Sequence, residues 1–148
     1  MSVLANLLAE IEEHGYTFTP AYEVMGESTT GGNNTWPGYW GATELEVEGP
    51  TEPTADLWAE MRANKTALLV YAVLREPPAW LAKSLECYRQ GYAVRVRWGG
   101  HDVALRMDLT TLSNHVAAAV GMSPAAGREV RPFVEEALSE LDRGEDAP

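Results

Sequence analysis

The sequence has a single cysteine, Cys87, which excludes an internal disulfide and any metal site that needs several thiolates. It also lacks a long apolar run. The longest, ALLVYAVL at 67–74, is much shorter than the roughly 20 residues that a membrane-spanning helix needs. No basic segment followed by an apolar segment opens the chain, so no secretion signal is expected. These absences predict a soluble, cytoplasmic protein without a membrane partner.

Lysine and arginine are absent from residues 1–61, which contain eleven aspartates and glutamates. Residues 62–148 contain eleven residues of each sign, so the formal net charge of −11 lies entirely in the first 61 positions. We call residues 1–61 the acidic half and residues 62–148 the charge-balanced half. Such an asymmetry is typical of a protein whose partner carries positive charge.

No catalytic or metal-binding signature occurs in the chain, since both Gly-x-Ser-x-Gly and His-Glu-x-x-His are absent. The stretch GESTTGG, 26–32, has the glycine spacing of a phosphate-binding loop but lacks the Lys-Ser/Thr pair that such a loop requires. No full set of metal ligands surrounds any of the three histidines, His14, His101 and His115. We therefore predict no catalytic residues, no metal ligands and no cofactor, and the protein is not expected to be an enzyme.

Several segments have the apolar periodicity of amphipathic helices, with apolar residues at i, i+3, i+4 and i+7. The predicted helices cover residues 3–14, 55–64, 79–90, about 110–120 and about 125–142. Alternation predicts strands at 16–25, an edge strand because it contains Pro20, and at 42–49. The last residues, 143–148, are expected to fray.

The pattern of residues 92–107, YAVRVRWGGHDVALRM, predicts a β-hairpin. A two-residue hairpin turn requires a positive φ at both of its central residues, and Gly99 and Gly100 can both adopt it. Pairing residues whose numbers add to 199 places Val94 and Val96 on an apolar face and Arg95 and Arg97 on the opposite face. The apolar face is expected to join the core.

The run TALLVYAVL, 66–74, is interpreted as a central buried strand, with a helix continuing from residue 55 as the alternative. As a strand, it would form a right-handed βαβ crossover with the helix at 79–90 and the strand at 92–98. The predicted fold is therefore a single α+β domain over residues 1–148. It has a mostly antiparallel sheet of about four strands with one βαβ crossover, helices packed on one face of the sheet, and a C-terminal helical hairpin.

The stretch GESTTGGNNTWPGYWG, 26–41, is predicted to be a loop that holds three large aromatic side chains, Trp36, Tyr39 and Trp40. Trp and Tyr are the commonest anchors of protein interfaces, because they supply a large contact area at low entropic cost. Two interpretations stay open: a binding loop, or a loop whose rings cap the core.

Five acids of the acidic half form the predicted docking face. Glu44, Glu46 and Glu48 alternate along one strand, about 6.8 Å apart. Asp56 and Glu60 follow at i and i+4 on the next helix. A solvated surface that only keeps the protein soluble is the simpler interpretation of the same residues.

These features predict a non-catalytic acidic binding protein that engages a basic macromolecular surface. An inhibitor, an antitoxin-like or immunity-like protein and an anti-defence accessory all fit this description, and mimicry of nucleic acid is one version of it. The expected partner is a basic protein, for example one that itself binds nucleic acid. The aromatic residues would anchor the partner and the acids would steer it. Self-association stays open.

An alternative function comes from residues 112–131, which resemble a helix-turn-helix. Ala117 is the small residue four positions before the turn glycine, Gly121, and apolar residues stand where the pattern expects them. The segment departs from the pattern at Gly127, which weakens a helix. The residues that would meet DNA phosphates are Arg128 and Arg131. This alternative is a DNA-binding regulator, and a phage-type virion assembly subunit is a further alternative.

Overall fold

The computed structural model describes residues 3–25, 29–30, 34–35, 39–91, 93–98 and 100–146, and the side chains of 3–24, 40–91, 100–101, 107–123 and 125–143. Its helices are α1 (Val3–Glu13), α2 (Ala55–Ala63), α3 (Lys65–Arg75), α4 (Ala79–Gln90), α5 (Leu109–Ala119) and α6 (Gly127–Asp146). The chain is α+β, as predicted. None of the described helices is both long and apolar enough to span a membrane.

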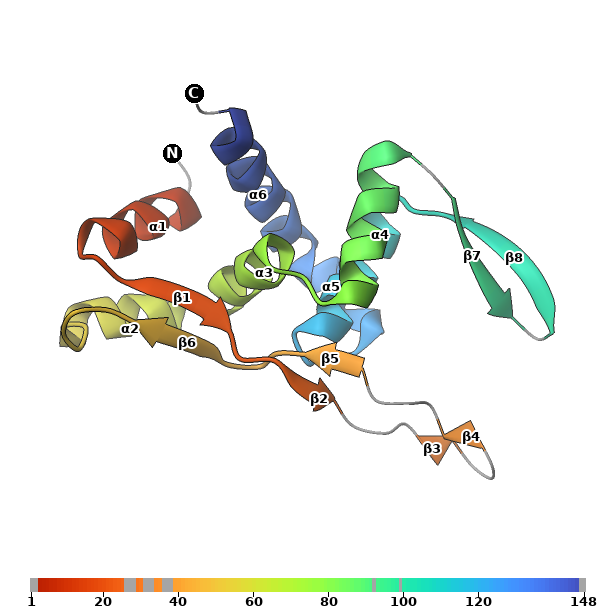
Figure 1. Ribbon diagram of the computed structural model, residues 1–148, viewed down its shortest axis with the longest axis horizontal. Helices are drawn as coiled ribbons and strands as arrows, with labels where there is room; N and C mark the ends of the chain where they lie inside the picture. Colours follow the sequence, from red (N-terminus) through yellow and green to blue (C-terminus); the bar gives the residue numbers. More distant parts are fainter. Residues whose placement is uncertain are drawn as a thin grey trace.

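The described strands of the acidic half form an antiparallel β-ribbon (Figure 1). Its pairs are β1 (Thr17–Pro20) with β6 (Leu45–Glu48), β2 (Glu23–Met25) with β5 (Tyr39–Gly41), and β3 (Thr29–Thr30) with β4 (Asn34–Thr35). The numbers of paired residues add to 65 in the first pair and to 64 in the other two. Residues 42–44 therefore face the shorter segment 21–22, as in a β-bulge.

The predicted loop at 26–41 thus contains short paired strands, and its assignment as a plain loop is wrong. The pairing of β1 with β6 places the chain segments that follow β1 and precede β6 opposite one another. Three of the four residues of β3 and β4 are threonines, whose β-branched side chains favour strands.

The centre of the core is α3, so the predicted strand at 66–74 is wrong and the alternative of a helix is right, although this helix begins at Lys65 and does not continue α2 from residue 55. Leu68, Val70 and Val73 are fully buried, and α3 packs against β1 and the neighbouring helices α2, α4, α5 and α6. A segment that is buried on every side carries no polar face to reveal its period. Its continuous apolar run therefore fits a buried strand and a buried helix equally well.

Without a strand at 66–74, the part of the chain that the structure describes forms two-stranded sheets in place of the predicted four-stranded sheet and βαβ crossover. The remaining strands, β7 (Ala93–Trp98) and β8 (His101–Arg106), pair with one another and with no other strand among the described residues. The predicted register is confirmed, with Val94 opposite Leu105 and Val96 opposite Val103. In Figure 1 this hairpin stands beyond α4, and the side chains of its predicted apolar face lie outside those described.

The other predicted helices are confirmed, including the C-terminal helical hairpin that α5 and α6 form. Gly15 follows α1 with φ +79°, and Gly91 ends α4 with φ +74°, a conformation that favours glycine. The first turn of α1 docks on α6, where the Leu4 N–H donates to the Glu136 carboxylate at 3.1 Å. α6 continues to Asp146, past its predicted end at 142.

Candidate functional site

The outer face of the β1–β6 pair carries two of the predicted carboxylates. Glu46 and Glu48 are exposed, while Leu45 and Val47 are half-buried on the other face. Thr19 lies opposite Glu46 in the register, so polar residues from both strands share the outer face. The predicted alternation along this strand is confirmed.

Glu44 differs from its two neighbours because it has a basic partner. Its Oε1 accepts from the Lys65 Nζ, at the start of α3, at 2.7 Å, and both side chains are exposed. Exposed ion pairs contribute about 0–1 kcal/mol. Glu44 can therefore exchange this lysine for a cation on a partner at little cost, but it is not an uncompensated charge in the free protein.

The carboxylates of α2 lie against α1. The carboxyl group of Glu10 on α1, with which Glu60 can share a proton and whose charge repels that of Glu60, raises the pKa of Glu60. Burial and the charge of Asp56 raise it further, in that order. Two like-charged groups are held in contact here, and both are acids of a segment that contains no base.

Glu10 was not among the predicted site residues. It lies on the first helix of the chain, 50 positions before Glu60, and nothing in the local pattern of α1 indicates which later segment it will meet. The contact follows from the packing of α1 against α2, a tertiary feature. We define the acidic surface as Glu10, Glu46, Glu48, Asp56 and Glu60. Figure 1 shows that the elements carrying these residues, α1, β6 and α2, lie at the same end of the molecule.

Of the three predicted aromatic residues, Trp36, Tyr39 and Trp40, the structure describes the side chain of Trp40. Trp40 is 53% exposed, so its ring does not cap the core. Its carbonyl accepts from the indole N–H of Trp80 on α4 at 2.8 Å, and the N–H of Ala42 donates to the carbonyl of Ala119 on α5 at 2.8 Å. These two bonds attach the base of the predicted loop to α4 and α5, which the sequence did not indicate.

Of the other two aromatic residues, Tyr39 lies in β5 opposite Met25, with a side chain outside those described. Trp36 lies outside the described residues. Trp40 is therefore the aromatic residue for which the structure supplies an environment. Its exposed ring stands on backbone that hydrogen bonds at Trp40 and Ala42 attach to α4 and α5.

A polar contact between α4 and α5 lies near this attachment. The Ser84 hydroxyl is 2.9 Å from His115 Nδ1 and 3.3 Å from the carbonyl of Trp80, and the rings of His115 and Trp80 have centroids 6.4 Å apart. Burial lowers the pKa of His115. The imidazole and the buried hydroxyl of Ser84 thus join the two helices.

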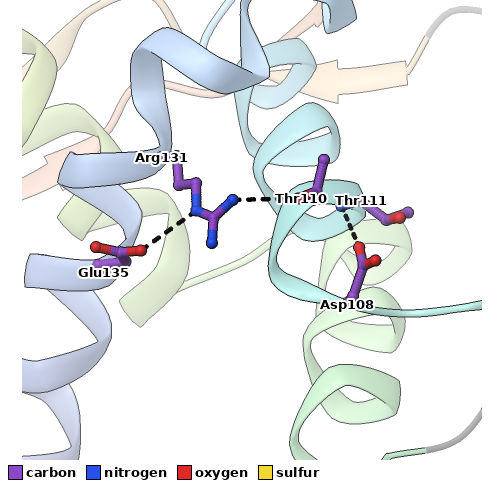
Figure 2. A network of polar contacts seen from close by, with 5 residues as sticks. All are labelled: Asp108, Thr110, Thr111, Arg131 and Glu135. Atoms are coloured by element: carbon purple, nitrogen blue, oxygen red, sulfur yellow. Dashed lines mark hydrogen bonds and ion pairs between the residues drawn. The ribbon is translucent and has the colours of Figure 1, made fainter.

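The residues of the alternative DNA-binding site lie at the contact of α5 and α6. Figure 2 shows Arg131 reaching from α6 towards α5, where its Nη1 donates to Thr110 Oγ1 at 3.3 Å while its Nε donates to Glu135 Oε1 at 3.3 Å. Asp108 caps α5 by accepting from the Thr111 N–H at 2.8 Å. That bond, with a smaller effect from Arg131, lowers the pKa of Asp108.

Position 127 requires a glycine for a structural reason that the sequence did not reveal. A Cβ atom at this position would lie 1.9 Å from Asn114 Oδ1 and 2.9 Å from the Cα of Asn114. The glycine therefore permits close packing of α6 on α5, and it is not a defect in a recognition helix.

The exposed strip at the start of α6 has two residues of each sign, Arg128, Glu129, Arg131 and Glu135. The opposite side of α6 is buried. This strip presents no net positive charge to a nucleic acid.

Comparison with family models, with curated proteins and with solved structures finds no match to this chain.

Proposed function

We propose that the protein is a non-catalytic binding protein whose acidic surface engages a basic surface on a macromolecular partner, as an inhibitor, an immunity-like protein or an anti-defence accessory would. The observation that carries this proposal is the packing of α1 on α2, which gathers Glu10, Asp56 and Glu60, acids of a segment without a base, closely enough that the other two raise the pKa of Glu60. These carboxyl groups, of which Asp56 and Glu60 are exposed, repel one another at neutral pH. A basic side chain placed between them would remove the repulsion.

The distribution of ion pairs supports the same proposal. Arg89, Arg131 and Arg143 pair with acids of the charge-balanced half, at 3.3, 3.3 and 3.5 Å. These bases are thus engaged away from the acidic surface. A surface with one sign of charge steers an oppositely charged partner and raises its association rate, an effect that salt suppresses.

Trp40 supplies the apolar component of the proposed interface. Its exposed ring lies on a strand four residues before Glu44, on backbone that α4 and α5 hold in place. Pre-ordered backbone lowers the entropic cost of binding. If Trp40 lies at the centre of the interface, its truncation to alanine costs about 2 kcal/mol or more of binding free energy.

The test compares two variants with the same change in net charge. The first, Glu46→Gln, Glu48→Gln, Asp56→Asn, Glu60→Gln, neutralises four of the five acids of the acidic surface. The control, Glu86→Gln, Glu129→Gln, Glu140→Gln, Asp142→Asn, neutralises four acids of the charge-balanced half. Each protein is used to capture partners from native lysate at about 0.1 M and about 0.5 M salt, with identification by mass spectrometry.

We expect a basic protein that wild type and control retain at low salt, that the first variant loses, and that high salt releases. Equal loss in both variants, or a partner indifferent to salt, would contradict the proposal. The same proteins are mixed with random duplex DNA in a mobility-shift assay. Binding at physiological salt that Arg131→Glu abolishes would replace the proposal with the DNA-binding alternative.

A further inference from the structure

The β7–β8 hairpin has little support from the rest of the described structure. Its strands pair with one another and with no other described strand, and its main contact with another element is that of β7 with α4. Figure 1 shows the hairpin standing away from the helices. A two-stranded hairpin in water is marginally stable at best. A second surface that packs against this hairpin would therefore stabilise it.

The hairpin is also basic, and we call β7 and β8 together the basic hairpin. Its strands contain three arginines, Arg95, Arg97 and Arg106, and one acid, Asp102, which gives a net charge of +2 with histidine counted as neutral. Arg95 and Arg97 alternate along β7, and Arg106 lies opposite Ala93, the preceding alternate position. Alternate and directly opposed positions share a face of a hairpin, so the register gives the three arginines positions on one face, with Asp102 opposite Arg97.

The basic hairpin and the acidic surface lie at opposite ends of the molecule. In Figure 1, which has the longest axis horizontal, α1, β6 and α2 are at one end and β7 and β8 are at the other. The two surfaces therefore do not meet within one copy of the chain. Two copies that lie side by side in opposite directions would bring each hairpin to the acidic surface of the other. Such a pair is closed and two-fold symmetric, like most small oligomers.

We propose that the basic hairpin of one copy of this chain binds the acidic surface of a second copy. The inference rests on the function proposed above, because it uses the same acidic surface and identifies a second copy as a basic partner. Guanidinium groups suit such a surface, since they pair with carboxylates through two parallel hydrogen bonds. Placed beside Glu60, a guanidinium would also offset the repulsion from Glu10 and Asp56.

The charged groups next to the two surfaces are occupied elsewhere. Asp108, two residues after β8, caps α5 by accepting from the Thr111 N–H at 2.8 Å. Arg62, the base of α2, lies over the Trp58 ring, with its guanidinium carbon 5.7 Å from the ring centroid. Each surface thus keeps its own sign of charge for a partner.

The formal net charge of −11 favours a second copy over a nucleic acid as the partner of the hairpin. A two-stranded ribbon fits a major groove, but a polyanion would present charge of the repelled sign to the whole chain. Two copies in opposite directions instead keep their acidic ends far apart, with each facing a hairpin. Repulsion between the remaining charges is screened beyond about 10 Å at 0.1 M salt.

The proposal is tested by sedimentation velocity of the full chain at increasing protein concentration, at about 0.1 M and about 0.5 M salt. The hairpin variant is Arg95→Gln, Arg97→Gln, and the acid variant is the four-acid variant of the capture experiment. The matched control, Arg128→Gln, Arg143→Gln, removes two positive charges from α6. A second hairpin variant, Arg95→Lys, Arg97→Lys, keeps the charge. Circular dichroism establishes that each variant is folded.

We expect wild type, the control and the lysine variant to form a dimer at low salt. The dissociation constant should rise about tenfold or more at high salt, in the hairpin variant and in the acid variant, because each change removes the attraction between the two surfaces. A mixture of the hairpin variant with the acid variant should form a one-to-one dimer. The first supplies the intact acidic surface and the second supplies the intact hairpin.

The proposal is overturned if wild type stays monomeric, if its association is indifferent to salt, or if the mixed variants do not associate. It is also overturned if the control weakens the dimer as much as the hairpin variant does, since the effect would then be one of general charge. Binding of random duplex DNA that the hairpin variant abolishes, without a change in self-association, would assign the hairpin to nucleic acid instead.

Failure here is distinguishable from failure of the proposed function. A monomeric wild type that still captures a basic protein from lysate contradicts only the self-association. A dimer that forms as expected, in a protein that captures no basic partner, contradicts only the foreign partner.

Discussion

Two glycines of this chain mark places where the structure has no room for a side chain. A Cβ at Gly49 would lie 2.0 Å from a ring carbon of Tyr16, whose hydroxyl is 3.2 Å from Thr51 Oγ1 in the turn after β6. A Cβ at Gly127 would meet Asn114 on α5. In both cases the neighbour is far away in sequence. The requirement for glycine therefore becomes visible only when the chain has folded.

Gly127→Ala tests this requirement at the helix pair. The added methyl group would lie 2.9 Å from the Cα of Asn114, and backbone cannot rotate away as a side chain can. We expect the free energy of unfolding to fall by about 1–3 kcal/mol, the usual cost of overpacking. Ser139→Ala, at an exposed site on the same helix, serves as the control and should change it by less than about 0.5 kcal/mol. Chemical denaturation measures both, and equal effects would contradict the prediction.

The pH dependence of Glu60 is a second residue-scale prediction. Because its folded pKa is raised, the stabilising shared proton is present below the unfolded pKa and is lost as the pH rises through the folded value. Glu60→Gln keeps a neutral donor beside Glu10 at every pH. The melting temperature of this variant should exceed that of wild type at about pH 7 and match it at about pH 4.

Glu12→Gln removes the same charge from an exposed site on α1 and serves as the control. If it raises the melting temperature as much as Glu60→Gln, then general repulsion explains the effect and the specific contact does not.

At the scale of elements, the helices are held by side chains from other parts of the chain. α1 has no acidic residue in its first turn to stabilise its N-terminal N–H groups. Glu136, on α6, supplies a carboxylate to the Leu4 N–H instead. The first and the last helices of the chain are thus joined by a hydrogen bond that spans 132 positions of sequence.

Glu136→Ala should destabilise the protein by about 1 kcal/mol, the usual value for the loss of a helix cap. Glu136→Gln retains an oxygen acceptor without the charge, so it should lose less. Hydrogen exchange at the Leu4 amide, followed by NMR, should accelerate in the alanine variant and much less in the glutamine variant. Equal acceleration in both would indicate that the charge of Glu136 matters and the hydrogen bond does not.

At the scale of the whole molecule, α3 connects the parts. It contacts the ribbon through β1 and packs against α2, α4, α5 and α6. Arg75, at its end, donates to the carbonyl of Phe18 and stacks over the Phe18 ring, with 4.8 Å between the guanidinium carbon and the ring centroid. A protein built around one central helix is expected to unfold as one unit.

Leu68→Ala tests this expectation, because Leu68 is fully buried on α3. We expect the free energy of unfolding to fall by about 2–5 kcal/mol. Val3→Ala, at a residue 66% exposed, should change it by less than about 0.5 kcal/mol. The unfolding curves of the leucine variant from far-ultraviolet circular dichroism and from tryptophan fluorescence should coincide. Separate transitions would mean that the two halves unfold independently.

Local sequence signals were sufficient wherever an element has one polar and one apolar side. The helices α1, α2 and α4 and the β7–β8 register could be predicted because amphipathic spacing and turn glycines act over a few residues. The same holds for the outward orientation of Glu46 and Glu48. Each of these features depends only on near neighbours along the chain.

Tertiary structure alone decided the remaining features. Residues 67–70 and 72–74 are buried, so their sequence has no polar face to mark a period, and only the packing of the whole chain distinguishes the observed helix from a buried strand. The proximity of Glu10 to Glu60 arises where α1 and α2, which are distant in sequence, meet. The sequence by itself determined the amounts and the local order of charge and apolar surface. Packing determined which of these groups lie together, because contacts between distant segments depend on the whole fold.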